Sequence, residues 1–279
     1  MPRMFEPFEL PFVQRGLVEL LILAVPAGLL GTWIVLRRLA FFSHSVGTAA
    51  FPGLVLADGL GFAAPLGAFA AALAFTAGNA VLGRGRDRGR DSVIALVLVG
   101  CLAAGVILAS DVFESGANVE TLLFGSLLLV DGADIRLAAI AAVATLLASA
   151  LIGRRWLAQG FDPENAAIGR RERLALDAAL LGLIALASAA ALSVVGALLV
   201  ASLFVVPAAT ARLLTRRMLS WQLASIALVA AEGTVGLWLS VETDAPPGAT
   251  IACVAGAVFA LVAAGRALLS THPRPLRAT

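Results

Sequence analysis

The sequence predicts an all-α protein, a polytopic bundle of transmembrane helices. Of the 279 residues, 60% are hydrophobic and only 14% are charged, and the mean hydropathy is +0.97, far above that of a typical water-soluble domain. Apolar runs long enough to cross about 30 Å of hydrocarbon follow one another almost from end to end. The basic residues gather in the connections between those runs, as they do in membrane proteins.

The apolar runs predict about nine spans, with eight as the alternative. The predicted spans are residues 12–36, 43–63, 64–82, 92–112, 135–153, 174–192, 194–214, 219–239 and 249–264. The alternative arises because only Ser193 separates the sixth span from the seventh. Segment 121–130 is too short to cross, and we expect a re-entrant or interfacial piece on the outside. The runs leave little room for a soluble domain, so residues 1–279 are expected to form a single membrane domain.

The placement of arginine predicts the topology. All twenty basic residues are arginines, and their clusters fall on alternate connections. The remaining connections are acidic or neutral, so the positive-inside rule places the N-terminus outside and the C-terminus in the cytoplasm. The net charge of +2 therefore reflects topology rather than nucleic-acid binding.

Ionisable and strongly polar residues are rare within the predicted spans, and each is a candidate functional residue because burying a charge in hydrocarbon is costly. Four lie near span ends and are interpreted as solvated or snorkelling end groups: Asp111, Arg136, Asp177 and Arg212. Asn79 is also a polar residue within a predicted span, and no role is assigned to it. Glu232 lies in the middle of an apolar run with no arginine on the same span. It is either protonated or faces a wet cavity or a cation path.

His44 and Thr48 are four residues apart, so their side chains are expected one helical turn apart on the same face. Neutral imidazole is a good ligand for zinc and other transition-metal dications, although a lone histidine can equally serve as a structural hydrogen-bonding group. Asp58 follows His44 by fourteen positions, close to four turns, which favours the same face. The alternative for Asp58 is an outer helix end, because "ADGLGF" has the composition of a break.

The motifs of ATP hydrolysis and covalent catalysis are absent from the sequence. There is no "GxxxxGK[ST]" loop and no lysine, nor an "HExxH" or "GxSxG" motif. The longest basic connection, about residues 154–173, contains "FDPENAAIG", in which Asp162 and Pro163 are typical of a helix start and Gly169 of a stop. This pattern predicts a short helix along the membrane surface, either an ordinary interfacial helix or one that docks on a cytoplasmic partner.

Four stretches together resemble the permeases of the zinc/manganese ABC-importer family, which are ZnuB-like. They are "GLLGTWIVLRRLAFF" leading into "AAFPG", "LLFGSLL", "FDPENAAIG" and "VVGALLVASLFVVPAATARLL". The resemblance implies a type II ABC-importer-like permease: a homodimer in the bacterial inner membrane with no prosthetic group and no catalytic residue. An ABC ATP-binding subunit would dock from the cytoplasm, and an extracytoplasmic binding protein would deliver the metal ion.

The resemblance also implies roles for individual residues. The helix that meets the ATPase would comprise Phe161, Asp162, Pro163, Glu164, Ala167 and Gly169, and structural positions would be Pro52, Gly53 and Pro207. Family members usually carry "DAxSHAxxPG", whose aspartate and histidine are thought to line the metal path. Here His44 takes the aspartate position and Thr48 the histidine position. Two His44 residues in a dimer could provide two nitrogen ligands, with Glu232 or Asp58 providing an oxygen.

The cargo expected from the resemblance is Zn²⁺, because the AztB-like subset of zinc permeases shares "SHSVGTAAFPG". Manganese or iron carried by the same architecture is the first alternative, favoured if oxygen ligands dominate. A second alternative is an ion-coupled secondary transporter in which membrane carboxylates such as Glu232 are the coupling residues.

Overall fold

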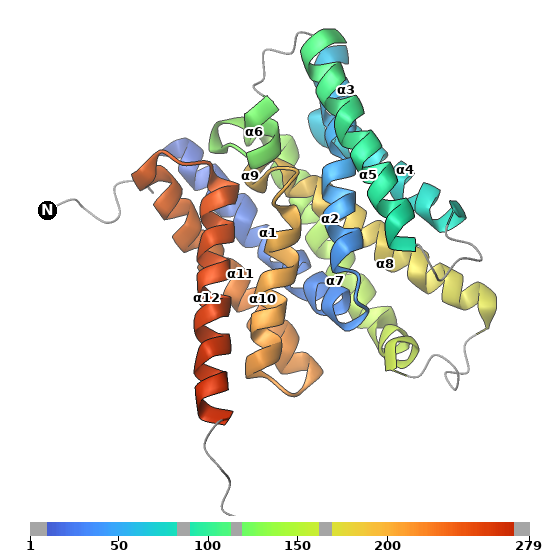
Figure 1. The fold of residues 1–279 in the computed structure, drawn as a ribbon, viewed down its shortest axis with the longest axis vertical. Helices are drawn as coiled ribbons and strands as arrows, with labels where there is room; N and C mark the ends of the chain where they lie inside the picture. The colour runs from blue at the N-terminus through green and yellow to red at the C-terminus, as the bar shows by residue number, and fades with distance from the viewer. Residues whose placement is uncertain (1–9, 83–89, 113–118, 162–168, 271–279) are drawn as a thin grey trace, which may run out of the picture.

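The computed structural model describes residues 10–82, 90–112, 119–161 and 169–270, and in these ranges every regular element is a helix (Figure 1). The elements in chain order are α1 (Pro11–Leu36), α2 (Ala40–Ala49), α3 (Phe51–Leu60), α4 (Ala64–Leu82), α5 (Arg90–Ile107) with a π-helical turn (Leu108–Val112), α6 (Val119–Phe124), a 3₁₀ turn (Leu127–Leu129), α7 (Gly132–Phe161), α8 (Arg170–Ala190), α9 (Leu192–Val195), α10 (Val200–Leu214), α11 (Met218–Thr243) and α12 (Pro247–Ser270). The predicted all-α fold class is confirmed.

Seven stretches of the described chain are long and apolar enough to cross a membrane, and each overlaps a predicted span. Two other predicted spans correspond to shorter apolar helices, Ala64–Asn79 and Val200–Leu214. The second has 15 residues, and at 1.5 Å per residue it is about 22 Å long, less than the thickness of the hydrocarbon core. The prediction of nine spans is therefore not confirmed.

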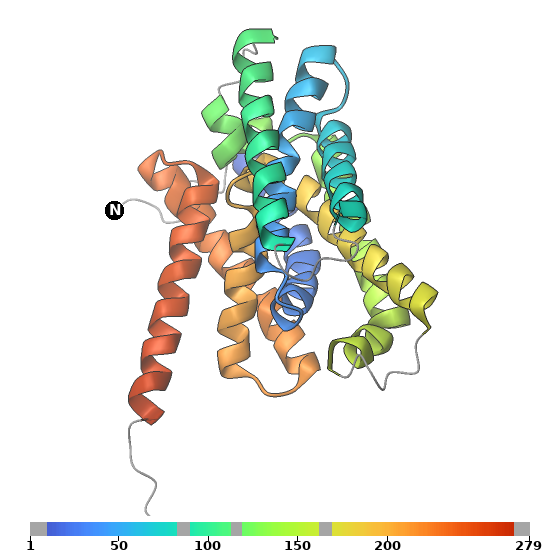
Figure 2. The same ribbon diagram turned by 45° about the vertical axis from the view of Figure 1, so that its right-hand side comes forward.

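Helix α1 lies at the centre of the bundle and α12 at its edge (Figures 1 and 2). In the most apolar 18-residue stretch of each helix, 72% of α1 is buried inside the protein but only 11% of α12. A helix that is apolar all round and buried all round belongs to the protein core, whereas an apolar exposed helix needs lipid or another chain to cover it. Helix α5, with 17% buried, is similarly peripheral.

Two predicted element boundaries need correction. The predicted span 43–63 corresponds to the stretch Ala40–Leu60, in which α2 and α3 meet at Ala50. The backbone of Ala50 stays helical (φ −72°, ψ −21°), but Pro52 cannot donate a backbone hydrogen bond to the Thr48 carbonyl. The predicted span 194–214 begins later, at Val200. Ser193 does not separate two long helices but lies in the one-turn helix α9, which ends at Gly196 with φ +81°.

The short segment predicted at 121–130 is confirmed as too short to span. It consists of α6 and the 3₁₀ turn, and it is held against the α9 region by two backbone hydrogen bonds. Ser126 N donates to Ser193 O at 2.9 Å, and Leu198 N donates to Leu123 O at 3.1 Å. These bonds satisfy backbone groups that no helix satisfies at this point of the bundle.

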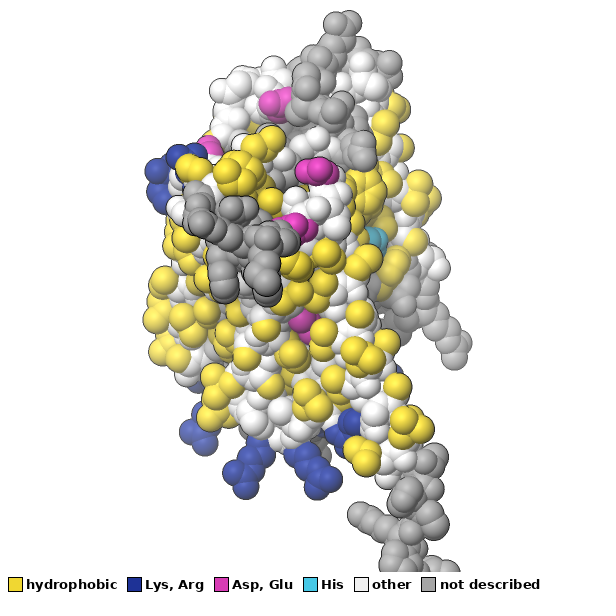
Figure 3. Space-filling view, turned by 90° about the vertical axis from the view of Figure 1, so that its left-hand side faces the viewer, with side chains coloured by type: hydrophobic (Ala, Val, Ile, Leu, Met, Phe, Trp, Pro, Cys, Tyr) yellow, Lys and Arg dark blue, Asp and Glu magenta, His cyan; other side chains and the backbone are white. Residues whose placement is uncertain are grey.

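Charged residues divide the molecule into two ends. In Figure 3 arginines project from the lower end and acidic side chains lie on the upper half, with one further basic group near the top. We call the lower end the arginine end, since it holds the α1–α2 and α10–α11 turns with Arg37, Arg38, Arg216 and Arg217. The opposite end, where α3 and α11 finish and α7 begins, is the acidic end.

Candidate functional site

His44 and Thr48 lie one turn apart on α2, as predicted. His44 is half-buried, and no side-chain hydrogen bond is found for its imidazole among the described residues. Thr48 is 1% exposed, and its hydroxyl donates to the His44 carbonyl at 3.2 Å. The Thr48 hydroxyl is thus engaged by its own helix, whereas the neutral imidazole has a lone pair that can bind a cation.

Pro52 and Gly53 position α3 directly beyond this pair. Gly53 is in backbone contact with Gly67 of α4, and a Cβ at either glycine would overlap the carbonyl oxygen of the other. Two helices can approach this closely only where both lack side chains. The structural role expected for Pro52 and Gly53 agrees with this geometry, and Pro207 lies buried inside α10.

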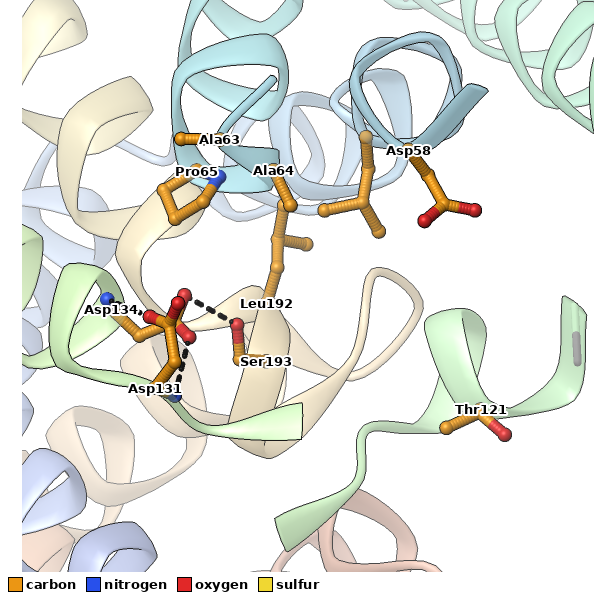
Figure 4. A pocket seen from close by; sticks show the side chains of 10 residues that line it. Asp58, Ala63, Ala64, Pro65, Thr121, Asp131, Asp134, Leu192 and Ser193 are labelled. Carbon is orange, nitrogen blue, oxygen red and sulfur yellow. Dashed lines mark hydrogen bonds between the residues drawn. The ribbon is translucent and has the colours of Figure 1, made fainter. Parts of the chain in front are cut away.

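A pocket of about 150 Å³ opens at the acidic end, between α3, α4, α7 and α9 (Figure 4). Its polar lining includes Asp58, Asp131, Asp134 and Ser193. The Ser193 hydroxyl donates to Asp134 Oδ1 at 2.7 Å, while Asp58 lies across the pocket at the end of α3. Asp58 is exposed, and the helix ends immediately after it at Gly61 with φ +73°. Asp58 therefore lies near a helix end, as its alternative interpretation expected.

Asp131 and Asp134 form a reciprocal cap at the start of α7. Asp131 Oδ1 accepts from Ala133 N at 2.6 Å and from Asp134 N at 3.0 Å, and Asp134 Oδ2 accepts from Asp131 N at 3.0 Å. The backbone N–H of Asp134, followed by that of Ala133, lowers the pKa of Asp131 below its ordinary value of 3.8. Neither aspartate was predicted as a site residue, although the spacing in "DGAD" is typical of a capped helix start.

Two glutamates are buried without a hydrogen-bond partner among the described residues. Glu232 on α11 is 3% exposed and Glu19 on α1 is 0% exposed, and both oxygens of each are unpaired. Glu19 was not predicted, although an acidic residue inside an apolar run was the signal that identified Glu232.

The described residues of one chain do not bring the predicted ligands together. They contain no group of three or more His, Cys, Asp or Glu side chains that could hold a metal ion. His44 is on α2 and Glu232 on α11, with α10 packed against both helices. Asp58 lies at the acidic end, roughly 20 Å along the helix from His44 at 1.5 Å per residue. The ligand set expected from two His44 residues with Glu232 or Asp58 is not formed within a single chain.

The predicted docking helix falls largely outside the described residues. Asp162, Pro163, Glu164 and Ala167 all lie in 162–168, while Phe161 is the last residue of α7 and Gly169 directly precedes α8. Nearby, Asp177, interpreted as a solvated end group, is partly exposed and also has a charged partner. Asp177 pairs with Arg37 at 2.7 Å, because the α1–α2 turn directs the guanidinium between α7 and α8.

The chain belongs to the ABC 3 transport family, whose sequence profile matches residues 9–266. The manganese transport system membrane protein MntC of Listeria innocua serovar 6a is 28% identical over 249 residues, which cover 89% of this chain and 88% of the relative. The chelated iron transport system membrane protein YfeD of Yersinia pestis is 26% identical over 272 residues, covering 98% of this chain and 90% of the relative.

The fold is similar to that of a solved structure, PsaBC from Streptococcus pneumoniae in complex with Fab. The TM-score is 0.80 at 24% identity, and the match covers 91% of this chain and 92% of that one. Family membership and the long apolar helices together make this chain a multi-pass membrane component of the ABC transport class. The resemblance to ABC permeases seen in the sequence is confirmed at this level. The two relatives named above carry manganese and iron in their names, which lends no support to the expected preference for zinc.

Proposed function

We propose that the chain is the permease subunit of an ATP-driven importer for divalent transition-metal ions. The observation that carries the proposal is the family match over residues 9–266, combined with relatives named for manganese and chelated iron transport. Manganese or iron is the first candidate cargo. Zinc is the second, because His44 supplies an imidazole nitrogen where a carboxylate was expected and imidazole suits zinc as well as iron.

The proposed path runs through the bundle from the acidic end to the arginine end. Asp58 and the carboxylates beside it attract a dication at the entrance, and His44 on α2 binds it deeper in the bundle. Thr48 and Glu232 complete the proposed path residues. Because the part of the chain that the structure describes does not assemble three ligands, the proposal includes a homodimer in which a second copy supplies the missing ones.

The proposed partners follow from the two ends of the molecule. The arginine end faces the cytoplasm of a bacterial cell, where a separate ATP-binding subunit docks on segment 162–168 and hydrolyses ATP. The N-terminus and the acidic end face outward, where a binding protein delivers the ion. The chain itself performs no covalent chemistry and has no resident cofactor.

The test is uptake by the reconstituted assembly. The chain is incorporated into liposomes with its ATP-binding subunit and binding protein, and ATP-dependent uptake of Mn²⁺, Fe²⁺ and Zn²⁺ is measured separately and in competition. His44→Ala is expected to lower uptake of the preferred ion at least about tenfold, as loss of a metal-site residue does. Ser45→Ala is the matched control, since its hydroxyl donates to Phe41 O on the same helix at 2.8 Å, and it should transport normally. Unchanged uptake in His44→Ala would rule out the proposed role of this histidine.

A further inference from the structure

Arg37 joins three helices at the arginine end. It is the residue that follows α1, and its Nη1 donates to Asp177 Oδ1 of α8 at 2.7 Å. Its Nη2 donates to Gln159 Oε1 at 3.1 Å and to Trp156 O at 3.2 Å, both on α7. Gln159 Nε2 closes the ring by donating to the same Asp177 oxygen at 2.9 Å. We call this set, Arg37, Trp156, Gln159 and Asp177, the three-helix junction.

An apolar contact reinforces the junction one turn deeper. The rings of Trp33 on α1 and Trp156 on α7 meet edge to face, with centroids 5.6 Å apart and planes at 66°. Trp156 Nε1 donates to Leu176 O of α8 at 2.9 Å. The same three helices are therefore fixed twice, once by buried aromatic rings and once by a charge-assisted network.

The junction lies between two functionally distinct parts of the chain. Gln159 precedes the proposed ATPase-docking segment 162–168 on α7, and Asp177 follows it on α8. On the other side, Arg37 leads through a tight turn, with Arg38 at φ +57° and Leu39 N donating to Ile34 O at 2.8 Å, into α2. His44 lies one turn into that helix.

The positive charge of Arg37 is largely buried at the junction, so it depends on its partners for compensation. The Arg37 side chain is 11% exposed and that of Asp177 is 44% exposed. Removing Asp177 leaves the largely buried guanidinium of Arg37 without its counter-ion. The contact therefore connects α7 and α8 to the turn that leads into α2.

We propose that Arg37 is the positioning residue that transmits movement of the α7–α8 connection to α2, and hence to His44. The inference rests on the proposed function. It does not require Arg37 to touch the transported ion or the nucleotide. The predicted defect is a loss of transport per ATP hydrolysed, rather than a loss of either hydrolysis or assembly.

A second ion pair provides a matched control within the chain. Arg155 of α7 pairs with Glu172 of α8 at the same 2.7 Å, but the side chains are 61% and 41% exposed. This pair connects the two helices that flank the docking segment without including α1. Exposed ion pairs contribute little to stability, so Arg155→Gln removes a similar charge while leaving Arg37 and its connection to α2 intact.

The experiment measures ATP hydrolysis and metal uptake side by side in liposomes containing the full assembly. Arg37→Gln and Asp177→Asn are expected to lower the number of ions transported per ATP at least about fivefold, the lower bound of common coupling energies. Asp177→Asn keeps the shape of the side chain and serves if Arg37→Gln assembles poorly. The exchanged pair, Arg37→Asp with Asp177→Arg, is expected to recover part of the ratio, and Arg155→Gln to keep it.

Two results would overturn the inference. In one, uptake and hydrolysis fall by the same factor in Arg37→Gln and Asp177→Asn, which indicates a purely structural role. In the other, Arg155→Gln lowers the ratio as much as the junction variants do. Absence of ATP-dependent uptake by the unmodified assembly would instead contradict the proposed function, and the inference with it.

Discussion

Asp131 combines two properties in one side chain, an exposed position at the acidic pocket and a cap on the longest helix of the bundle. Its carboxylate accepts two backbone N–H groups at the start of α7. These bonds favour the ionised form, which is why the pKa lies below 3.8. A group whose pKa is lowered by folding stabilises the folded state above its unfolded pKa, and this stabilisation disappears as the pH falls through the folded pKa.

Replacing this cap should have a pH-dependent cost. Asp131→Ala is expected to lower the free energy of unfolding by about 1 kcal/mol at neutral pH, the usual value for losing an N-cap. The difference from the wild type should shrink as the pH falls below the pKa of Asp131, because protonation weakens the same bonds in the wild type. Asp131→Asn caps without titrating and is the control. Thermal unfolding of the purified chain in detergent at neutral and acidic pH measures the effect, and an equal cost at both would contradict it.

The two buried glutamates differ in how a sequence reveals them. Glu232 stands out because its surroundings are uniformly apolar, whereas Glu19 lies near a polar N-terminal segment and close to Arg15 in the sequence. Only the fold shows that Glu19 is fully buried. Burial depends on which neighbours a helix acquires, and the local pattern of one helix does not contain that information.

At the scale of elements, close helix crossings depend on glycine. The crossing of α3 and α4 is built on Gly53 and Gly67, where a Cβ would meet backbone atoms that cannot move aside. By contrast, Gly78 on the same α4 has nothing within 4 Å of the position of a Cβ. One helix thus contains a glycine required by packing and a glycine that packing does not require.

Substituting these two glycines should produce opposite results. Gly67→Ala is expected to destabilise the protein by about 1–3 kcal/mol, because the added methyl group overpacks the crossing. Gly78→Ala is expected to be neutral or to stabilise by up to about 1 kcal/mol, the gain in helix propensity. Comparing the thermal unfolding of the two variants tests the crossing, and a Gly67→Ala variant as stable as Gly78→Ala would contradict it.

Much of the element order could be predicted from the sequence, but the interruptions could not be placed correctly. Apolar length predicts where a helix exists, so each predicted span overlaps a helix of the structure. The junction at Ala50 follows from Pro52, which is a local signal. The position of the short helix α9 inside an apolar run depends on tertiary contacts. Gly196, for example, adopts φ +81° where α9 meets the backbone of Leu123 and Gly125.

The site was harder to predict than the fold for a related reason. The four-residue spacing of His44 and Thr48 is a local property of one helix, and the prediction that they lie one turn apart is confirmed. The meeting of Arg37 with Asp177 joins residues 140 positions apart, and no periodicity in the sequence relates them. Asp58 lies in the same 21-residue stretch as His44, Ala40–Leu60, but at its exposed end.

At the scale of the whole molecule, the separation of charge predicts how the protein sits in the membrane. Ser220 and Thr243 are exposed residues at opposite ends of α11. With Cys101 and Cys253 replaced, Thr243→Cys is expected to react with a membrane-impermeant maleimide in intact cells. Ser220→Cys should react only after permeabilisation, because the positive-inside rule predicts that the arginine end faces the cytoplasm. The reverse labelling pattern would invert the proposed topology.

The edge-to-face contact of Trp33 and Trp156 also gives the protein a native optical signal. The chain has four tryptophans and no tyrosine, so its intrinsic ultraviolet emission is that of tryptophan alone. Two of the four emitters stand in contact at the three-helix junction. A rearrangement there would change their mutual quenching, so the emission of the unlabelled protein can follow this movement in real time, with Trp33→Phe to assign the signal.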